Sequence, residues 1–156
     1  MVFIISNFVY VHITKKIYKM KKIIYLPFVL FLLTTETYGA DKEFRPQIEK
    51  VITSQFNAFK EADLSLAYSY ASPELKRRYR SAEIFGQMVK DGYSDIWNSE
   101  SHTFEGLKLK GEMAYQIVTV FSSNNTINNY LYTLYSYNGE WVIAGVTRYR
   151  RGNLGV

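Results

Sequence analysis

The sequence of 156 residues contains no cysteine. Disulfide bonds, thiolate catalysis, cysteine-based metal sites and a lipid-modified cysteine are therefore excluded. Histidine is almost as scarce, because only two occur and only His102 follows residue 40. Zinc sites and Ser-His-Asp arrangements both need partners that a single histidine does not supply, so a surface or edge-strand position is the better interpretation of His102. The sequence predicts no metal site and no cofactor.

A strong surplus of one charge sign is missing from most of the chain. The formal net charge is +5, but five lysines and one glutamate precede residue 41. The remainder carries 14 Lys and Arg against 13 Asp and Glu, a net charge of +1. This near-neutral balance argues against nucleic acid as a partner. The basic runs 76–80 and 148–151 are local and are read as solvated surface, with anionic lipid contact as the alternative.

A long hydrophobic run is also missing. The most apolar stretch, Ile23–Leu33, has eleven residues and is interrupted by Pro27. A membrane-spanning helix needs roughly 20 apolar residues. Lys21-Lys22 precede it, and polar residues followed by Tyr38-Gly39-Ala40 come after it. Charge, a short apolar core and small residues are, in that order, typical of a secretory signal peptide. Residues 1–40 are therefore predicted to be a leader, with cleavage after Gly39 or Ala40, and residues 41–156 to be one domain.

Met20 directly precedes the two lysines and would give the leader a standard length. We therefore favour Met20 as the true start and residues 1–19 as a misannotated extension, the alternative being a long, positively charged first region. An export signal without disulfides suits a bacterial periplasm or exterior. Membrane contact is expected only through an uncleaved leader.

The first half of the predicted domain has helical periodicity. Apolar residues at spacings of three and four predict one amphipathic helix over residues 44–61, and its buried face is Ile48, Val51, Ile52, Gln55, Phe56 and Phe59. Asp63, Ser72 before Pro73, and Ser81 are each typical of the residue that caps a helix start. Three shorter helices are expected after these residues.

From Tyr93 onward the hydrophobic period changes to two, which predicts strands over 102–109, 113–121, 127–137 and 141–146. Lys110-Gly111 and Asn138-Gly139 predict tight turns, the second of type I′. Bulges are expected near Gly106 and Gly145. Helices followed by an antiparallel meander predict an α+β fold in which N-terminal helices pack on a curved antiparallel sheet and form a cone.

The domain resembles the bacterial family called domain of unknown function 4864 over nearly all of residues 44–150. The residues that carry the resemblance are Ile48, Val51-Ile52, Gln55, Ala58-Phe59, Asp63, Ala67-Tyr68, Ala71-Ser72-Pro73, Phe85, Met88-Val89, Tyr93 and the closing stretch 138–146. The resemblance implies the cystatin-like cone fold of nuclear transport factor 2 and ketosteroid isomerase relatives, and no established activity. The chain departs from the family at Tyr68, where phenylalanine is expected, and at residues 61–63, where the family has a more acidic pair.

A candidate catalytic group is Asp63, which would act as a general base at the mouth of the cone with Tyr68, Tyr93 or Tyr132 as hydrogen-bond donor. This hypothesis describes a cofactor-independent isomerase or lyase. A helix cap selects the same residue type, however, and capping is the better interpretation of Asp63.

The aromatic content suggests a different function. Alternation along the strand 127–137 places Tyr130 and Tyr132 toward the helices and Leu131, Tyr135 and Tyr137 on the outer face. A cavity for a small apolar or aromatic ligand would be lined by Phe59, Tyr68, Met88, Tyr93, Tyr115, Tyr132 and Trp141. A filled core is the simpler alternative. We therefore predict an exported, non-catalytic domain that binds a small ligand, with a homodimer formed through the outer tyrosines as a further possibility.

Overall fold

A computed structural model describes residues 36–150, with side chains from residue 42. The described residues from 40 onward belong to one compact unit. The predicted leader core and the predicted start at Met20 lie outside the described residues. Within the described part, no helix has the length and apolar character needed to cross a membrane.

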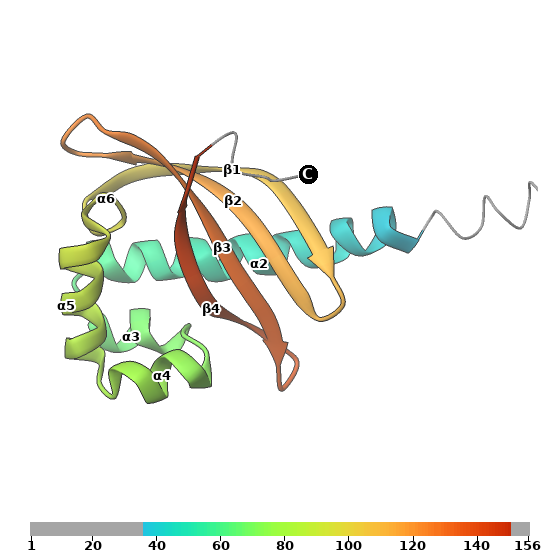
Figure 1. Cartoon of the computed structure of the whole chain (residues 1–156), viewed down its shortest axis with the longest axis horizontal. Helices are drawn as coiled ribbons and strands as arrows, with labels where there is room; N and C mark the ends of the chain where they lie inside the picture. The colour runs from blue at the N-terminus through green and yellow to red at the C-terminus, as the bar shows by residue number, and fades with distance from the viewer. Residues whose placement is uncertain (1–35, 151–156) are drawn as a thin grey trace, which may run out of the picture. The chain divides into compact units, whose positions relative to one another are not determined.

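The longest element is helix α2, Glu36–Lys60, which confirms the predicted amphipathic helix and begins eight residues earlier, with Pro46 inside it. Ile48 and Ile52 are fully buried, and Phe56 and Phe59 are nearly so. These residues lie one turn apart on a single helical face, so that one stripe of α2 faces the sheet. Figure 1 shows α2 running across the sheet.

Three short helices follow, and each begins at the predicted cap. These helices are α3 (Leu64–Ser69), α4 (Pro73–Tyr79) and α5 (Ala82–Gly92). The side chains of Asp63, Ser72 and Ser81 accept hydrogen bonds from the backbone N–H groups three residues later, at 2.9, 3.3 and 3.3 Å. Helix α6, Ser94–Trp97, was not predicted, because it has four residues and no side-chain cap.

The remaining elements are strands β1 (Ser99–Lys110), β2 (Met113–Ser122), β3 (Ile127–Tyr137) and β4 (Glu140–Tyr149). They form one antiparallel sheet in the order β1-β2-β3-β4. Asn138 and Gly139 have φ angles of 53° and 83°, which confirms the predicted type I′ turn. Both predicted bulges are present, one in β1 between Phe104 and Leu107, and one in β4 that leaves Ala144 as the extra residue opposite β3.

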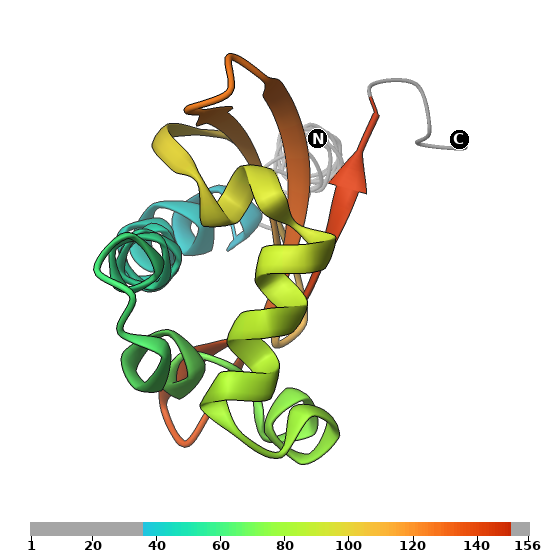
Figure 2. The same ribbon diagram turned by 90° about the vertical axis from the view of Figure 1, so that its left-hand side faces the viewer.

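The bulged part of β4 is tied to the short helices. Ser72 N–H donates to Ile143 C=O at 2.8 Å, and Ile143 N–H donates to Tyr70 C=O at 2.9 Å. Figure 2 looks onto this end of the domain, where α5 passes in front of the sheet and α2 is seen end-on beside it. The helices therefore pack together against one face of the sheet, which is its inner face. The architecture is the predicted α+β cone.

Candidate functional site

A cavity of about 180 Å³ lies between the helices and the inner face of the sheet. Its wall is formed by Gln55, Phe59, Leu75, Arg78, Tyr79, Phe85, Met88, Val89, Tyr93, Ile96, Tyr132, Ile143, Ala144, Gly145 and Val146. These residues come from α2, α4, α5, α6, β3 and β4 together with Tyr93 between α5 and α6. The cavity therefore exists only because the helical half and the strand half of the chain close on each other.

Burial distinguishes the floor of this cavity from its mouth. The floor is formed by the buried members, which are Gln55, Phe59, Phe85, Val89, Ile96, Tyr132 and Ile143. The half-buried members Leu75 and Tyr79 on α4, Met88 on α5 and residues 144–146 on β4 surround the mouth, where Arg78 is exposed. The cavity thus opens between α4 and the bulged edge strand.

Two polar atoms of the floor have no hydrogen-bond partner among the described residues. Gln55 uses its Nε2 to donate to Ala67 C=O at 3.1 Å, which leaves its Oε1 free. The Tyr132 hydroxyl makes no hydrogen bond either, and burial raises the pKa of Tyr132, as do the neighbouring Tyr130 and Tyr93. Tyr93, in contrast, donates its hydroxyl to Val146 C=O at 2.8 Å. The floor is therefore apolar and aromatic with one free amide oxygen and one free hydroxyl.

Four of the seven residues predicted to bind a ligand meet at this cavity, namely Phe59, Met88, Tyr93 and Tyr132. Tyr68 does not line the cavity. Its ring packs against Phe85, which does, at a centroid distance of 5.5 Å, and its hydroxyl donates to Lys76 C=O at 2.7 Å. Trp141 is on the inner face but packs against Phe44, at a centroid distance of 5.7 Å, and does not line the cavity.

The predicted position of Tyr115 is wrong. Ala114, Gln116 and Val118 are the buried residues of β2, so Tyr115 points to the other face of the sheet. There it lines an outer groove of about 370 Å³ together with Gly106, Leu107, Lys108, Lys110, Ile117, Leu131 and Tyr149.

The hypothesis that Asp63 is a general base is also not supported. Asp63 is exposed, does not line the cavity, and accepts a hydrogen bond from Leu66 N–H as the cap of α3. A general base must lie within reach of a substrate proton in a site that excludes water. Asp63 is therefore a capping residue.

His102 lies on the edge strand β1, as the sequence predicted, with its ring stacked on Phe56 at a centroid distance of 4.4 Å. Its Nε2 is 3.1 Å from Thr53 Oγ1. Burial lowers the pKa of His102, and the positive charge of Lys60 lowers it further. No group of three or more metal-ligating side chains occurs in the described part of the chain.

The lowered pKa of His102 predicts that the domain is less stable in mild acid. The folded protein holds the imidazole neutral, whereas the unfolded chain binds a proton near pH 6.5. The free energy of unfolding should therefore fall as the pH is lowered below about 6.5. Urea unfolding at pH 7.5, 6 and 5 measures this, and His102→Phe should flatten the curve in that range. An equally steep curve in the variant would assign the effect to other groups.

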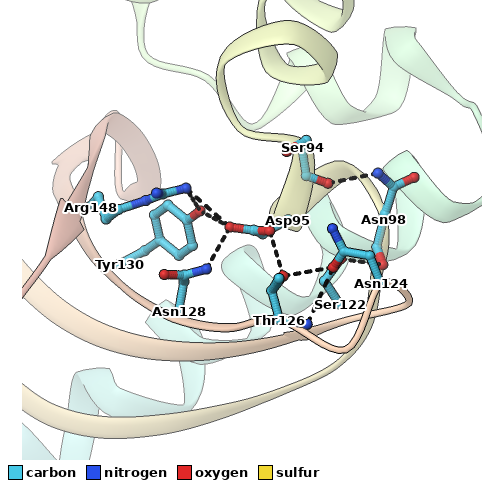
Figure 3. Close-up of polar contacts among 9 residues, drawn as sticks. All are labelled: Ser94, Asp95, Asn98, Ser122, Asn124, Thr126, Asn128, Tyr130 and Arg148. Carbon is cyan, nitrogen blue, oxygen red and sulfur yellow. Dashed lines mark hydrogen bonds and ion pairs between the residues drawn. The ribbon is translucent and has the colours of Figure 1, made fainter.

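A buried carboxylate forms a second polar site, which the sequence analysis missed (Figure 3). The Asp95 side chain on α6 is 6% exposed. It accepts hydrogen bonds from Thr126 Oγ1 at 2.7 Å, Tyr130 hydroxyl at 2.8 Å, Asn128 Nδ2 at 2.9 Å and Arg148 Nη2 at 3.1 Å. Asp95 thus joins α6 to the turn before β3, to β3 itself and to β4.

The electrostatics of Asp95 favour a structural role. Burial alone would raise its pKa, but the hydrogen bonds from Thr126 and Tyr130, the charge of Arg148 and the Asn128 bond together lower it. Both carboxylate oxygens accept hydrogen bonds, Oδ1 from Thr126 and Oδ2 from Tyr130, Asn128 and Arg148. The only sequence signal was the alternation of Thr126, Asn128 and Tyr130 along one face of a strand, which predicts a polar cluster without identifying its acceptor.

The comparison with known protein families finds one match. The model of the family described as domain of unknown function (DUF4864) matches residues 41–154. The chain belongs to this family. The match covers every described helix and strand from α3 to β4 and residues 41–60 of α2. No curated protein matches the chain. The DUF4864 family carries no assigned activity, so the function of this DUF4864 domain has to be argued from its cavity.

Proposed function

We propose that this DUF4864 domain binds a small apolar or aromatic molecule, of the size of one ring, in the cavity between its helices and its sheet. The observation that carries the proposal is a cavity of about 180 Å³ whose floor is aromatic and holds two free polar atoms. A well-packed core leaves few voids larger than a water molecule. An apolar cavity of about 150 Å³ in another protein holds a benzene molecule.

The two free polar atoms describe the ligand more closely. Gln55 Oε1 accepts a hydrogen bond and the Tyr132 hydroxyl donates or accepts one. A ring with a hydroxyl group would pair with them and would leave no polar group of the floor unsatisfied. The smallness of the cavity limits the affinity, and for a ligand of eight or nine heavy atoms we expect a Kd between roughly 10 μM and 1 mM.

The proposed function is binding and not catalysis. The residues that line the cavity include no acidic side chain and no histidine. General acid–base chemistry uses such groups most often. Among the tyrosines of the wall, Tyr93 donates its hydroxyl to the backbone carbonyl of Val146, so no acidic or basic side chain orients it.

Isothermal titration calorimetry with benzyl alcohol tests this proposal. Binding should be saturable with one site per chain, and its heat-capacity change should be negative because apolar surface is buried. Methanol, which offers the hydroxyl without the ring, is the control and should give only heat of dilution. A heat signal that grows linearly with benzyl alcohol and never saturates would reject the proposal.

We also propose that the domain is exported and related to the cone-fold group of nuclear transport factor 2 and ketosteroid isomerase. The leader pattern in residues 1–40 supports export to a bacterial periplasm or exterior. The cone of helices and curved sheet supports the relationship. N-terminal sequencing of protein recovered from an exporting cell should find Ala40 or Asp41 first.

A homodimer is a second candidate, and the outer groove favours it. On this solvent-facing side of the sheet, Tyr115, Ile117, Leu131 and Tyr149 form an apolar surface. Apolar and aromatic side chains grouped on one face are typical of association surfaces. Light scattering coupled to size-exclusion chromatography would detect the dimer, and a monomer at high concentration would exclude it.

A further inference from the structure

The mouth of the cavity contains one charged side chain. Arg78 on α4 is the only ionised residue in the described wall, where no acidic residue is present. Arg78 is exposed and its guanidinium lies 5.8 Å from the centre of the Tyr79 ring. It has no ion-pair partner among the described residues. A positive charge therefore stands beside an apolar pocket without an anion to match it.

The neighbouring basic residues differ from Arg78 in this respect. Arg77 pairs with Glu74 at 3.1 Å, and Lys76 Nζ donates to Ser69 C=O at 2.7 Å. Arg148, on the adjacent strand, is bound to Asp95. The basic residues 76–80 thus do not all face solvent in the same way. Arg78 lies at the cavity, whereas Lys76 and Arg77 bind other partners.

We propose that the ligand of the cavity is a small carboxylic acid with a single ring, whose carboxylate binds Arg78 at the mouth. This inference rests on the proposed function, because the ring has to occupy the cavity. Guanidinium is planar and offers paired N–H donors that match the two oxygens of a carboxylate. Arylacetates have this shape, with one ring and a carboxylate on a one-carbon stem.

The burial gradient of the site fits such an amphiphile. Moving a carboxylate into an apolar interior is costly unless it is paired and hydrogen-bonded. In the proposed pose the ring reaches the buried floor near Phe59 and Tyr132, while the carboxylate stays at the exposed mouth and remains partly hydrated. The pairing with Arg78 consequently adds only modestly to the binding affinity. It discriminates between ligands that have the same shape and differ in charge.

Calorimetric titration with phenylacetate and phenylacetamide tests the inference, because the two molecules are nearly isosteric and differ in charge. Phenylacetate should bind about threefold to tenfold more tightly, as expected for a partly exposed ion pair. Arg78→Met should remove this preference and leave the affinity for phenylacetamide within about twofold. The preference should also shrink in 0.5 M salt, since exposed charge pairs are screened.

Arg80→Met is the matched control. Arg80 belongs to the same basic run, is exposed and does not line the cavity, and its replacement changes the net charge by the same amount. Arg80→Met should keep the preference, and circular dichroism would verify that both variants are folded. Equal affinities in the native protein, or equal loss in both variants, would overturn the role of Arg78 and leave the proposed function standing. Failure of both ligands to saturate would overturn the inference and count against the proposed function, on which the benzyl alcohol titration decides.

Discussion

Replacing Asp95 with alanine should lower the free energy of unfolding by about 2–4 kcal/mol. The variant loses four hydrogen bonds to a charged acceptor. Bonds of this kind contribute about 1.5–3 kcal/mol each, but Thr126 and Asn128 lie near the surface and recover part of the loss from water. Small domains are stable by only about 5–15 kcal/mol, so the effect is a large share of the total.

Two buried tyrosines on the same face of β3 provide graded controls. Tyr130→Phe removes one bond to Asp95 and should cost about 1.5–3 kcal/mol. Tyr132→Phe removes a hydroxyl that has no partner in the described part of the chain, so stability should stay the same or rise slightly. Urea unfolding curves measure all three variants. An equal loss from both phenylalanine variants, or no loss from Asp95→Ala, would contradict the structural role given to Asp95.

The same experiment has a pH dependence of known sign. The pKa of Asp95 is lower in the folded protein than its ordinary value of 3.8. The stability that the carboxylate contributes is therefore present above about pH 3.8 and is lost as the pH falls through the folded pKa. The difference between the native protein and Asp95→Ala should consequently shrink in strong acid.

Replacing Val146 with phenylalanine should abolish ligand binding while the domain stays folded. Val146 is half-buried at the mouth of the cavity and lies opposite Tyr132 in the register of β3 and β4. A benzyl side chain at this position would occupy the space proposed for the ligand's ring. We expect the affinity for benzyl alcohol to fall by more than about tenfold, and the overpacking to cost about 1–3 kcal/mol at most.

Val142→Phe is the matched control, because Val142 lies on the same strand and outside the wall of the cavity. It pairs with Tyr135, whose neighbours on the inner face of β3 are the buried residues, so its side chain points to the outer side. Calorimetry should find native affinity in this variant. Unchanged affinity in Val146→Phe would place the ligand elsewhere on the molecule.

The parts of the fold that local chemistry determines were predictable from the sequence. Asp63, Ser72 and Ser81 begin helices because a short polar side chain at each start satisfies a free backbone N–H group. Asn138-Gly139 predicts its turn because both residues tolerate positive φ. These signals lie within a few residues of the feature they determine.

The parts that depend on distant partners were missed. Asp95 meets Arg148 across 53 positions of sequence, and nothing local to either residue indicates the other. Helix α6, which carries Asp95, is too short to show a period. A polar cluster of this kind becomes visible only when the strands are placed next to the helix.

The error at Tyr115 has a different physical cause. Strand β2 is largely apolar on both faces, and its buried face includes the small Ala114 and the polar Gln116. If the more hydrophobic face of β2 is assigned to the core, the set that contains Tyr115 is therefore chosen wrongly. Gln116 can be buried because its Nε2 donates to backbone carbonyls, that of Ile117 at 3.0 Å and those of Glu105 and Gly106 at the β1 bulge. Its Oε1 has no hydrogen-bond partner in the described structure.

The ¹H–¹⁵N correlation spectrum of the domain, recorded during a titration with phenylacetate, tests the central claim most directly. A ligand in the cavity should shift the amide signals of Phe59, Met88 and residues 144–146, and should leave those of Tyr115 and Leu131 in the outer groove unchanged. Saturating shifts confined to the outer groove, or uniform small shifts without saturation, would contradict it.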